Sequence, residues 1–385
     1  MSLVRDNADT KNKPTVIDLF CGCGGFSLGA ARAGFSVVGS IDNDPHALAA
    51  HKKNFPHSIH LNVDLSQMSG AKIRKLLALD NAVIDGVIGG PPCQGFSSIG
   101  HRDDTDPRNL LFMHFFRLVS QLRPEFFLSE NVPGILRADY ESVRTTALRH
   151  VENDYTILPP LKLFACNYGA PTSRVRAFFF GYRKHNPLAL EPSSFLPPSD
   201  IEEIRVEAAL KGLPKKIRPE WQTEQQGWRK VGETHNGAFG NRLSVCIPEG
   251  IGDQEAIRRL KEENRVSGCL GTQHTPAVIQ RFRNVKPGGM DDASKCRRLD
   301  PNGFCPTLRA GTGSDRGSYQ AVRPIHPTED RVITPREAAR LQGFPDWFQF
   351  DATKWHSFRQ IGNSVSPLLA ERVLDVIRKA FACER

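Results

Sequence analysis

Short runs of apolar residues recur through the first half of the chain and predict buried β-strands. The runs are rich in β-branched and aromatic side chains, and polar or glycine-rich stretches separate them, which is typical of strands inside an α/β fold. Segments with apolar residues at helical spacing, such as residues 28–33 and 109–122, lie between the runs and predict helices. The predicted strands comprise residues 15–20, 35–41, 60–65, 82–88, 124–129 and 172–181.

This alternation predicts an α/β domain in which helices cover a largely parallel sheet. The first predicted strand leads into a glycine-rich turn at residues 21–27 and then into a helix. Such a strand–turn–helix opening is typical of nucleotide-binding α/β units. By itself the glycine-rich turn is weak evidence, because similar turns bind many nucleotides or nothing.

The pattern changes near Asn186, where four prolines crowd a short stretch that predicts a linker. From there to about Asp330 the periodicities are short and mixed. A capped helix then follows, with Thr334 as N-cap, Pro335 at its first position and Gly343 as its end. We therefore predict a catalytic and cofactor-binding domain at 1–187, a smaller and irregular domain at 188–325, and a C-terminal return to the first domain at 326–385.

Composition and charge narrow the class of protein. The chain has 385 residues, a formal net charge of +9 and nine cysteines. The positive charge suggests a polyanionic partner. The cysteines form no CxxC pair and no metal-ligand spacing, which indicates free thiols in a reducing cytosol and argues against a disulfide scaffold or a metal site. The polar N-terminus predicts no signal peptide, and no apolar run reaches membrane-spanning length.

One stretch, residues 89–98, carries the strongest chemical signal. It reads Gly-Gly-Pro-Pro-Cys-Gln-Gly-Phe-Ser-Ser and follows the predicted strand at 82–88. Pro91 and Pro92 fix their φ angles, so Cys93 is held on a stiff, non-helical segment beyond a strand end, where α/β sheets usually bind ligands. The alternative is a buried structural cysteine beside a tight turn, since free cysteines are commonly buried.

Acidic residues lie at the ends of the second and third predicted strands. Asp42 follows the strand at 35–41, where a carboxylate is well placed to accept hydrogen bonds from both hydroxyls of a ribose. It could equally cap the helix that starts near Pro45, and both roles can hold together. Asp64 ends the third predicted strand and is a candidate for contact with an adenine amino group.

Two further sites have charged residues next to apolar strands. Glu130 follows the strand at 124–129, so it should face the same pocket as Cys93, although it could simply cap a turn. Arg174 and Arg176 lie two apart and should share one strand face. The residues after them are wholly apolar, so a buried strand is predicted whose arginines need polar or anionic partners.

Residues 100–108 are polar and predict either a solvated loop or a lid that closes over a ligand.

A local excess of basic residues occupies positions 281–309. It suits contacts with phosphates, although a solvated surface would have the same composition. The candidates for DNA contact in this segment are Arg281, Arg283, Arg297 and Arg298.

Taken together, these stretches resemble the DNA (cytosine-5)-methyltransferase family. Six motifs match in the family's order between Asp18 and Ala370, leaving roughly residues 188–300 unmatched. The resemblance implies a Rossmann-like S-adenosylmethionine-dependent methyltransferase domain with a smaller target-recognition domain. It implies Cys93 as nucleophile, with Glu130, Arg174 and Arg176 as further catalytic residues.

The resemblance also implies the ligand contacts. Gln94 and Ser97 would contact DNA from the loop after Cys93, and Thr307 and Leu308 match a Thr-Leu element of the recognition region. Two positions depart from the family pattern: Asn43 replaces a large side chain that stacks on adenine, and Thr172 replaces a glutamine. The implied S-adenosylmethionine contacts are Asp18, Phe20, Gly22, Gly25, Asp42, Asp64, Leu65, Pro92, Asn363, Ser364 and Val365.

The function implied is sequence-specific transfer of a methyl group to C5 of a flipped-out cytosine in double-stranded DNA. We expect a monomer in the bacterial cytoplasm, with a restriction endonuclease as a separately acting partner. Two alternatives remain at this point: a tRNA cytosine-5 methyltransferase of the same family, and a non-catalytic DNA-binding relative. The large segment 188–325 favours DNA, because reading a duplex requires a module that faces its grooves.

Overall fold

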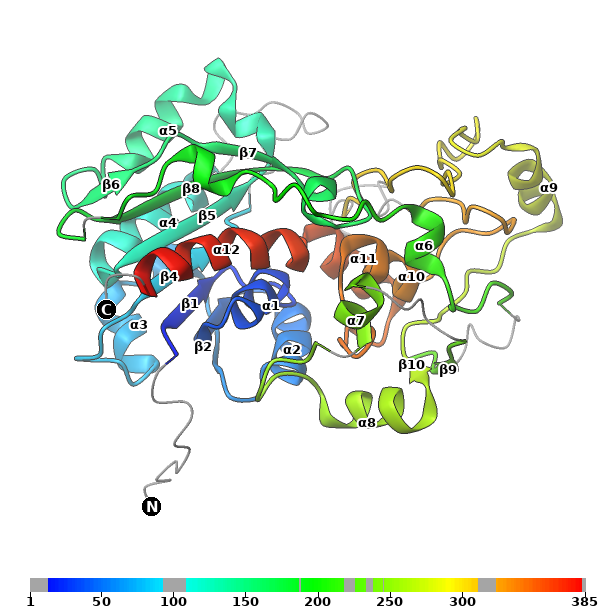
Figure 1. Ribbon diagram of the computed structural model, residues 1–385, viewed down its shortest axis with the longest axis horizontal. Coiled ribbons are helices and arrows are strands. Elements are labelled where there is room, and N and C mark those ends of the chain that lie inside the picture. The colour runs from blue at the N-terminus through cyan, green and yellow to red at the C-terminus, as the bar shows by residue number, and fades with distance from the viewer. Residues whose placement is uncertain are drawn as a thin grey trace.

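The computed structural model describes residues 13–92, 109–186, 188–217, 226–232, 238–244, 246–310 and 323–382. Its centre is an eight-stranded sheet with the order β3-β2-β1-β4-β5-β8-β6, in which β7 also pairs with β8 (Figure 1). The strands are β1 (Thr15–Leu19), β2 (Ser36–Asp42), β3 (Ile59–Asn62), β4 (Gly86–Gly89), β5 (Phe126–Asn131), β6 (Tyr155–Ile157), β7 (Leu161–Phe164) and β8 (Val175–Arg183).

The sheet is parallel from β3 to β5 and antiparallel beyond, where β8 runs against β5, β6 and β7. The chain moves outward from β1 through β2 to β3, then returns to the other side of β1 to form β4. The order therefore reverses between β1 and β4, which is where open α/β sheets bind ligands. The predicted α/β class is confirmed.

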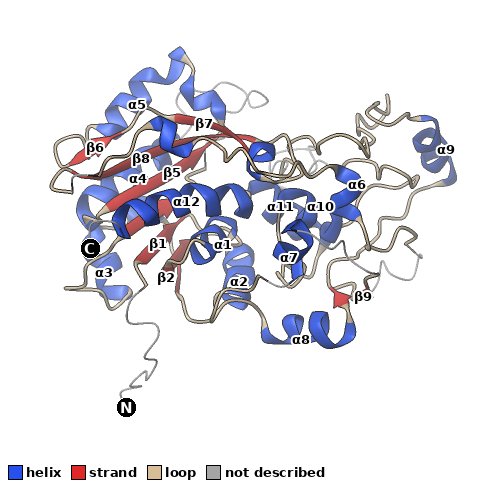
Figure 2. Cartoon of the chain, in the orientation of Figure 1, coloured by secondary structure: helices blue, strands red, loops and turns tan. Residues whose placement is uncertain are grey.

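Helices cover both faces of this sheet (Figure 2), because alternate strand residues point to opposite sides. Val16, Ile88 and Phe178 belong to one core cluster, while their neighbours Ile17 and Val87 belong to the other. The first cluster packs against α1 (Gly25–Arg32), α2 (Pro45–Asn54) and α12 (Pro367–Ala382); the second packs against α3 (Gly70–Leu76), α4 (Asn109–Leu122) and α5 (Glu141–Leu148).

Two predicted strands are longer than the observed ones. The segment 82–85 precedes β4 as irregular chain, so the prediction of a strand was wrong for these residues; Val83 is 70% exposed, whereas Ile84 is buried. Asp85 accepts hydrogen bonds from the backbone N–H and hydroxyl of Thr15, which joins the start of β1 to the approach to β4. The third strand ends at Asn62, and Asp64 instead caps a short 3₁₀ helix at Leu65–Gln67.

The irregular region after the sheet contains short elements that continue its core. Leu188, Val206, Leu260 and Val266 belong to the same cluster as the sheet face under α1. α9 lies far from the sheet (Figure 1). The elements are α6 (Val206–Leu210), β9 (Arg229–Lys230), α7 (Ala238–Ser244), α8 (Gln254–Glu263), β10 (Arg265–Val266) and α9 (Pro276–Asn284).

The last part of the chain returns to the sheet through α10 (Pro335–Gln342), α11 (Lys354–Asn363) and α12. The predicted ends of α10 are confirmed: the Thr334 hydroxyl accepts from the Glu337 N–H, the Glu337 carboxylate accepts from the Thr334 N–H, and Gly343 closes the helix at φ 90°. α12 then packs along α1, so these two helices, far apart in sequence, cover the same face of the sheet. Among the described residues, no helix combines the length and apolar character needed to cross a membrane.

Candidate functional site

The register of four neighbouring strands aligns the predicted site residues in one row. Leu19 pairs with Ile41 on one side and with Gly89 on the other, and Gly89 pairs with Ser129. The residues that follow these four are Phe20, Asp42, Gly90 and Glu130. Because parallel strands end at the same edge, all four lie at the carboxyl edge of the sheet, around the point where the strand order reverses.

The glycine-rich turn at this edge has unusual backbone conformations. Phe20 adopts a φ of 64°, which is strained for a residue with a side chain, and Gly24 adopts a φ of 103°. The Cys21 N–H donates to the Ile41 carbonyl, which fixes the turn to the end of β2. Gly24 is the N-cap of α1 and provides no side-chain acceptor for the first backbone N–H groups of the helix. Backbone N–H groups of this kind suit a polar ligand.

Asp42 holds this turn from β2. Its carboxylate accepts hydrogen bonds from the N–H groups of Gly22 and Asp44, both at 2.8 Å. Burial raises its pKa. The N-cap of α2 is Asp44, which accepts from the N–H groups of His46 and Ala47. The alternative that Asp42 caps this helix is therefore wrong, and Asp42 joins two turns at the sheet edge.

The turn after β3 is held by a residue that the sequence did not single out. Arg117 of α4 donates to the carbonyls of Leu65 and Met68, at 3.1 and 2.9 Å. Asp64 caps the same turn by accepting from the Ser66 N–H. Arg117 thus fixes the position of Asp64 and Leu65, two of the residues predicted to contact the cofactor. The only signal in the sequence was that Arg117 is the one Asp, Glu, Lys or Arg residue within the mainly apolar helical pattern of residues 109–122.

The C-terminal motif reaches the glycine-rich turn from the far end of the chain. A side chain at Gly25 would place its Cβ 1.9 Å from the Ser364 hydroxyl oxygen and 2.4 Å from the Val365 carbonyl oxygen. Only glycine therefore permits this approach. Asn363, the last residue of α11, lies next to this contact in sequence. The structure brings the predicted N-terminal and C-terminal cofactor residues together.

Glu130 lies beside the segment that leads to the predicted nucleophile. A Cβ at Gly90 would be 3.2 Å from Glu130 Oε2, and Asn131 Nδ2 lies 3.4 Å from the Pro91 carbonyl oxygen. Pro92 is exposed at the end of this segment. Cys93, Gln94 and Ser97 lie outside the described residues, as does the predicted polar loop at 100–108.

Arg176 forms an ion pair with Glu130. Arg176 Nε lies 2.5 Å from Glu130 Oε1, and the two side chains are only 10% and 9% exposed. The antiparallel pairing of β5 with β8 sets this contact, because Asn131 lies opposite Ala177. A buried carboxylate with a fixed guanidinium partner can hold a polar group of a substrate in a defined orientation.

Arg174 has different partners from Arg176. It lies one residue before β8 and is 1% exposed, and its guanidinium donates to the carbonyls of Leu308 and Gly362, at 3.1 and 3.0 Å. Burial, followed by the nearby charge of Arg176, lowers its pKa well below the ordinary value. Arg174 therefore ties together three distant segments. The Thr172 hydroxyl reinforces this junction by donating to the Cys305 carbonyl at 3.0 Å.

The predicted DNA-contact residues divide by exposure. Arg281 and Arg283 are exposed but paired, with Asp291 at 3.2 Å and Asp330 at 3.0 Å. Arg297 is exposed, and its guanidinium donates to the Gly288 carbonyl. The Leu308 side chain is buried and Thr307 is half-buried.

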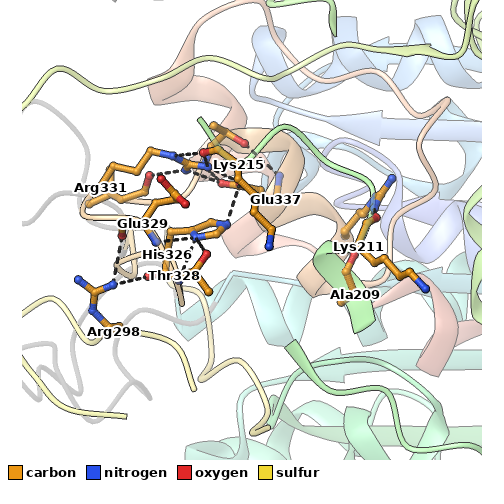
Figure 3. Close-up of polar contacts among 12 residues, drawn as sticks. Ala209, Lys211, Lys215, Arg298, His326, Thr328, Glu329, Arg331 and Glu337 are labelled. Carbon is orange, nitrogen blue, oxygen red and sulfur yellow. Dashed lines mark hydrogen bonds and ion pairs between the residues drawn. The ribbon is translucent and has the colours of Figure 1, made fainter. Parts of the chain in front are cut away.

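Arg298 is only 5% exposed, and its donors serve the protein (Figure 3). They reach the carbonyls of Phe282, His326 and Glu329 and the carboxylate of Asp330. In this structure Arg298 is therefore not available to DNA, because burial has committed its hydrogen bonds to neighbouring segments.

Comparison with known proteins adds a family assignment for these features. The profile of the C-5 cytosine-specific DNA methylase family matches residues 14–379. The type II methyltransferase M.XorII of Xanthomonas oryzae pv. oryzae is 40% identical over 371 residues, which cover 96% of this chain and 85% of the relative. The type II methyltransferase M.DdeI of Desulfomicrobium norvegicum is 32% identical, covering 95% of this chain and 89% of the relative.

A solved structure resembles the whole chain. It is a prophage-encoded protein of E. coli described as a DNA modification methyltransferase, with 49% sequence identity and a TM-score of 0.87. The alignment covers 96% of this chain and all of the other.

Proposed function

The chain belongs to the C-5 cytosine-specific DNA methylase family and is a DNA cytosine-5 methyltransferase; from this we propose a specific mechanism and set of partners. We propose that it transfers a methyl group from S-adenosylmethionine to C5 of a flipped-out cytosine through a covalent bond to Cys93. The observation that carries the proposal is the placement of Glu130 and Arg176 beside Gly90, at the sheet edge that also holds the glycine-rich turn.

The residues at this edge fit S-adenosylmethionine. The turn offers backbone N–H groups at the start of α1, and one carboxylate oxygen of Asp18, Oδ1, is buried without a hydrogen-bond partner among the described residues. Asp42 would hold the ribose, Asp64 and Leu65 the adenine, and residues 363–365 the methionine end of the site beside Gly25. When bound, S-adenosylmethionine supplies an electrophilic methyl group.

Cys93 would provide the nucleophile that makes C5 reactive. C5 of cytosine is a poor nucleophile, and addition of a thiolate at C6 converts the ring into an enamine-like species whose C5 is nucleophilic. After methyl transfer a base would remove the C5 proton, the bond between C6 and the Cys93 sulfur would break, and the methylated base and the free thiolate would be released. A free thiol has a pKa of about 8.5, so the site must favour the anion or remove its proton during attack. We choose Arg176 for this electrostatic support because it pairs with Glu130 beside Gly90, whereas Arg174 Nη1 donates to the carbonyls of Leu308 and Gly362.

Glu130 would hold or donate a proton at N3 of the base as C6 is attacked. Arg176 would keep the Glu130 carboxyl group oriented and would contact the base carbonyl. None of these atoms is reachable inside a duplex, so the cytosine must rotate out of the helix, at a cost of about a few kcal/mol. Phosphate contacts from the region 188–325 and from the loop after Cys93 would offset this cost.

We assign target recognition to residues 188–325, because the motifs at the strand ends already have proposed roles in cofactor binding and catalysis. Sequence discrimination requires side chains in the major groove, whereas phosphate contacts carry no sequence information. The type II relatives support a role in restriction-modification, in which a separately acting endonuclease would cut the unmethylated site. We propose a cytoplasmic monomer as the active form.

A trapping experiment tests the covalent route. Methylation sites are first mapped by bisulfite sequencing of DNA from cells that express the protein. A duplex with 5-fluorocytosine at the mapped position should then give a complex that survives denaturation, because fluorine at C5 does not leave as a proton does. The Cys93→Ala variant should give none and should still bind S-adenosylmethionine.

Three results would contradict the proposal. Normal turnover on cytosine without trapping would exclude the covalent adduct. Full methylation by Cys93→Ala would remove Cys93 from the mechanism. Methylation of tRNA with none on DNA would favour the other substrate class of the family.

A further inference from the structure

A buried chain of hydrogen bonds runs behind the proposed cofactor site. It joins four side chains from four elements: Asp18 in β1, Ser27 in α1, His51 in α2 and His60 in β3. The Ser27 hydroxyl donates to Asp18 Oδ2 at 2.6 Å, His51 Nε2 lies 3.0 Å from the same hydroxyl oxygen, and His51 Nδ1 lies 2.9 Å from His60 Nε2. Asp18, Ser27 and His51 are fully buried, and His60 is partly exposed.

The direction of these hydrogen bonds follows from the Ser27 hydroxyl. It has a single proton, and when that proton is donated to Asp18 its oxygen accepts from His51 Nε2–H. His51 Nδ1 is then the acceptor of a hydrogen bond from His60 Nε2–H. Burial lowers the pKa of His51 well below its ordinary value and also lowers that of His60. Both rings are thus neutral, with every donor pointing toward Asp18.

His51 also supports the glycine-rich turn by packing. Its ring lies 4.3 Å from the Phe55 ring, centroid to centroid. A Cβ at Gly24 would be 3.0 Å from His51 Cδ2 and 2.5 Å from Phe55 Cε2, so the turn rests directly on these two rings. A displacement of His51 would therefore move the turn through the contact with Gly24. It would also move Asp18 through the hydrogen bonds of Ser27.

We propose that His51 is a positioning residue of the cofactor site. Through Ser27 it fixes which carboxylate oxygen of Asp18 is engaged, leaving Oδ1 free of hydrogen bonds from described residues. Through the packing of its ring against Gly24 it fixes the position of the glycine-rich turn relative to α2. The inference rests on the proposed function for its readout, because it assigns His51 to the binding of S-adenosylmethionine and to no step of the chemistry.

Two substitutions of His51 distinguish the roles of its two ring nitrogens. In His51→Gln the side-chain amide reaches the place of Nε2, so the contact with Ser27 is kept. In His51→Asn the shorter amide reaches only the place of Nδ1, so the contact with His60 is kept and that with Ser27 is lost. Ser27→Ala breaks the same link from the other side with a minimal change in volume.

The affinity of the full-length protein for S-adenosylmethionine would be measured by calorimetry, together with KM, kcat, DNA affinity and thermal unfolding. We expect His51→Asn and Ser27→Ala to bind about tenfold more weakly, the scale of one lost buried hydrogen bond. KM for S-adenosylmethionine should rise while kcat and DNA affinity stay within about twofold of the wild type. His51→Gln should restore most of the affinity.

Unchanged affinity in Ser27→Ala would overturn the inference. So would equal losses in His51→Gln and His51→Asn that follow a common loss of thermal stability, because these would indicate a purely structural role. Nitrogen-15 shifts of the His51 ring in the protein without cofactor give an independent readout, and we expect a proton on Nε2 that responds to Ser27→Ala. If the wild type binds no S-adenosylmethionine while these shifts are as expected, the proposed function fails and the hydrogen-bond chain stands.

Discussion

Arg176 Nε lies 2.5 Å from Glu130 Oε1, where β8 runs antiparallel to β5. The two residues come from strands that are far apart in sequence, and the sheet register alone brings them together. Both side chains are almost completely buried. Removal of either partner therefore leaves a charge without compensation in a site of low dielectric.

Glu130→Gln should slow methyl transfer without weakening cofactor binding. The amide retains the size of the carboxylate but neither exchanges a proton with N3 nor pairs with the Arg176 charge. General acid–base catalysis contributes about 10²–10⁴-fold, so we expect a fall in kcat of that order. Single-turnover kinetics measure the loss, and calorimetry with S-adenosylmethionine is the control. A kcat within threefold of the wild type would remove Glu130 from the chemistry.

Arg174→Met should reduce stability, because Arg174 joins β8 to the Leu308 segment and to the end of α11. The variant leaves two buried carbonyls without their donor, and hydrogen bonds to charged groups are worth about 1.5–3 kcal/mol each. We expect the free energy of unfolding to fall by about 2–4 kcal/mol in urea denaturation. Arg149→Met, at an exposed position, is the matched control and should change little. Full stability in Arg174→Met combined with lost activity would return Arg174 to the catalytic set.

Arg297 and Arg298 are adjacent in sequence but should behave differently on substitution. Arg297→Gln removes an exposed cation, so DNA binding should weaken and the slope of log K against log salt should fall by about 0.9 if a phosphate contact is lost. Arg298→Gln removes a buried guanidinium that donates to Phe282, His326 and Asp330, so the free energy of unfolding should fall. Fluorescence anisotropy at several salt concentrations and urea denaturation test both variants. The reverse pattern would contradict the roles assigned here to the two side chains.

His326 should make the free energy of unfolding fall at acidic pH. Its ring is 3% exposed, and Nδ1 accepts from the N–H groups of Thr328 and Glu329 (Figure 3). Burial lowers its pKa to about 4, with Glu337 opposing the shift and Arg331, Lys215 and Arg298 adding to it. The side chain in the unfolded state has a pKa of about 6.5, so between these two values the unfolded state binds more protons and stability falls as the pH falls.

His326→Asn keeps an acceptor near the position of Nδ1 and removes the titration. Between pH 7.5 and pH 5 the wild type should lose about 2 kcal/mol that the variant keeps. Urea denaturation at the two pH values measures the difference. Parallel losses in both proteins would mean that the ring stays protonated or exposed in the folded state.

Local patterns in the sequence determined the elements and the edge of the sheet at which the site lies. Buried strands need apolar side chains on both faces, so the runs that became β1, β2, β5 and β8 are visible without a structure. The ends of α10 follow from Thr334, Pro335 and Gly343, because helix capping depends on residues at or next to the helix ends. Strand ends place Asp42 and Glu130 at one edge for the same reason: parallel strands end together.

Only the tertiary structure decided what the individual charges do. Arg174 and Arg176 share one local pattern, yet Arg176 meets Glu130 while Arg174 donates to Leu308 and Gly362, more than a hundred residues away. Arg297 and Arg298 are adjacent, yet one is exposed and the other buried. His51 showed no signal, because its partners Ser27 and His60 lie on other elements. A hydrogen bond is strong enough to assign a role only where burial excludes water, and burial depends on which distant segments pack together.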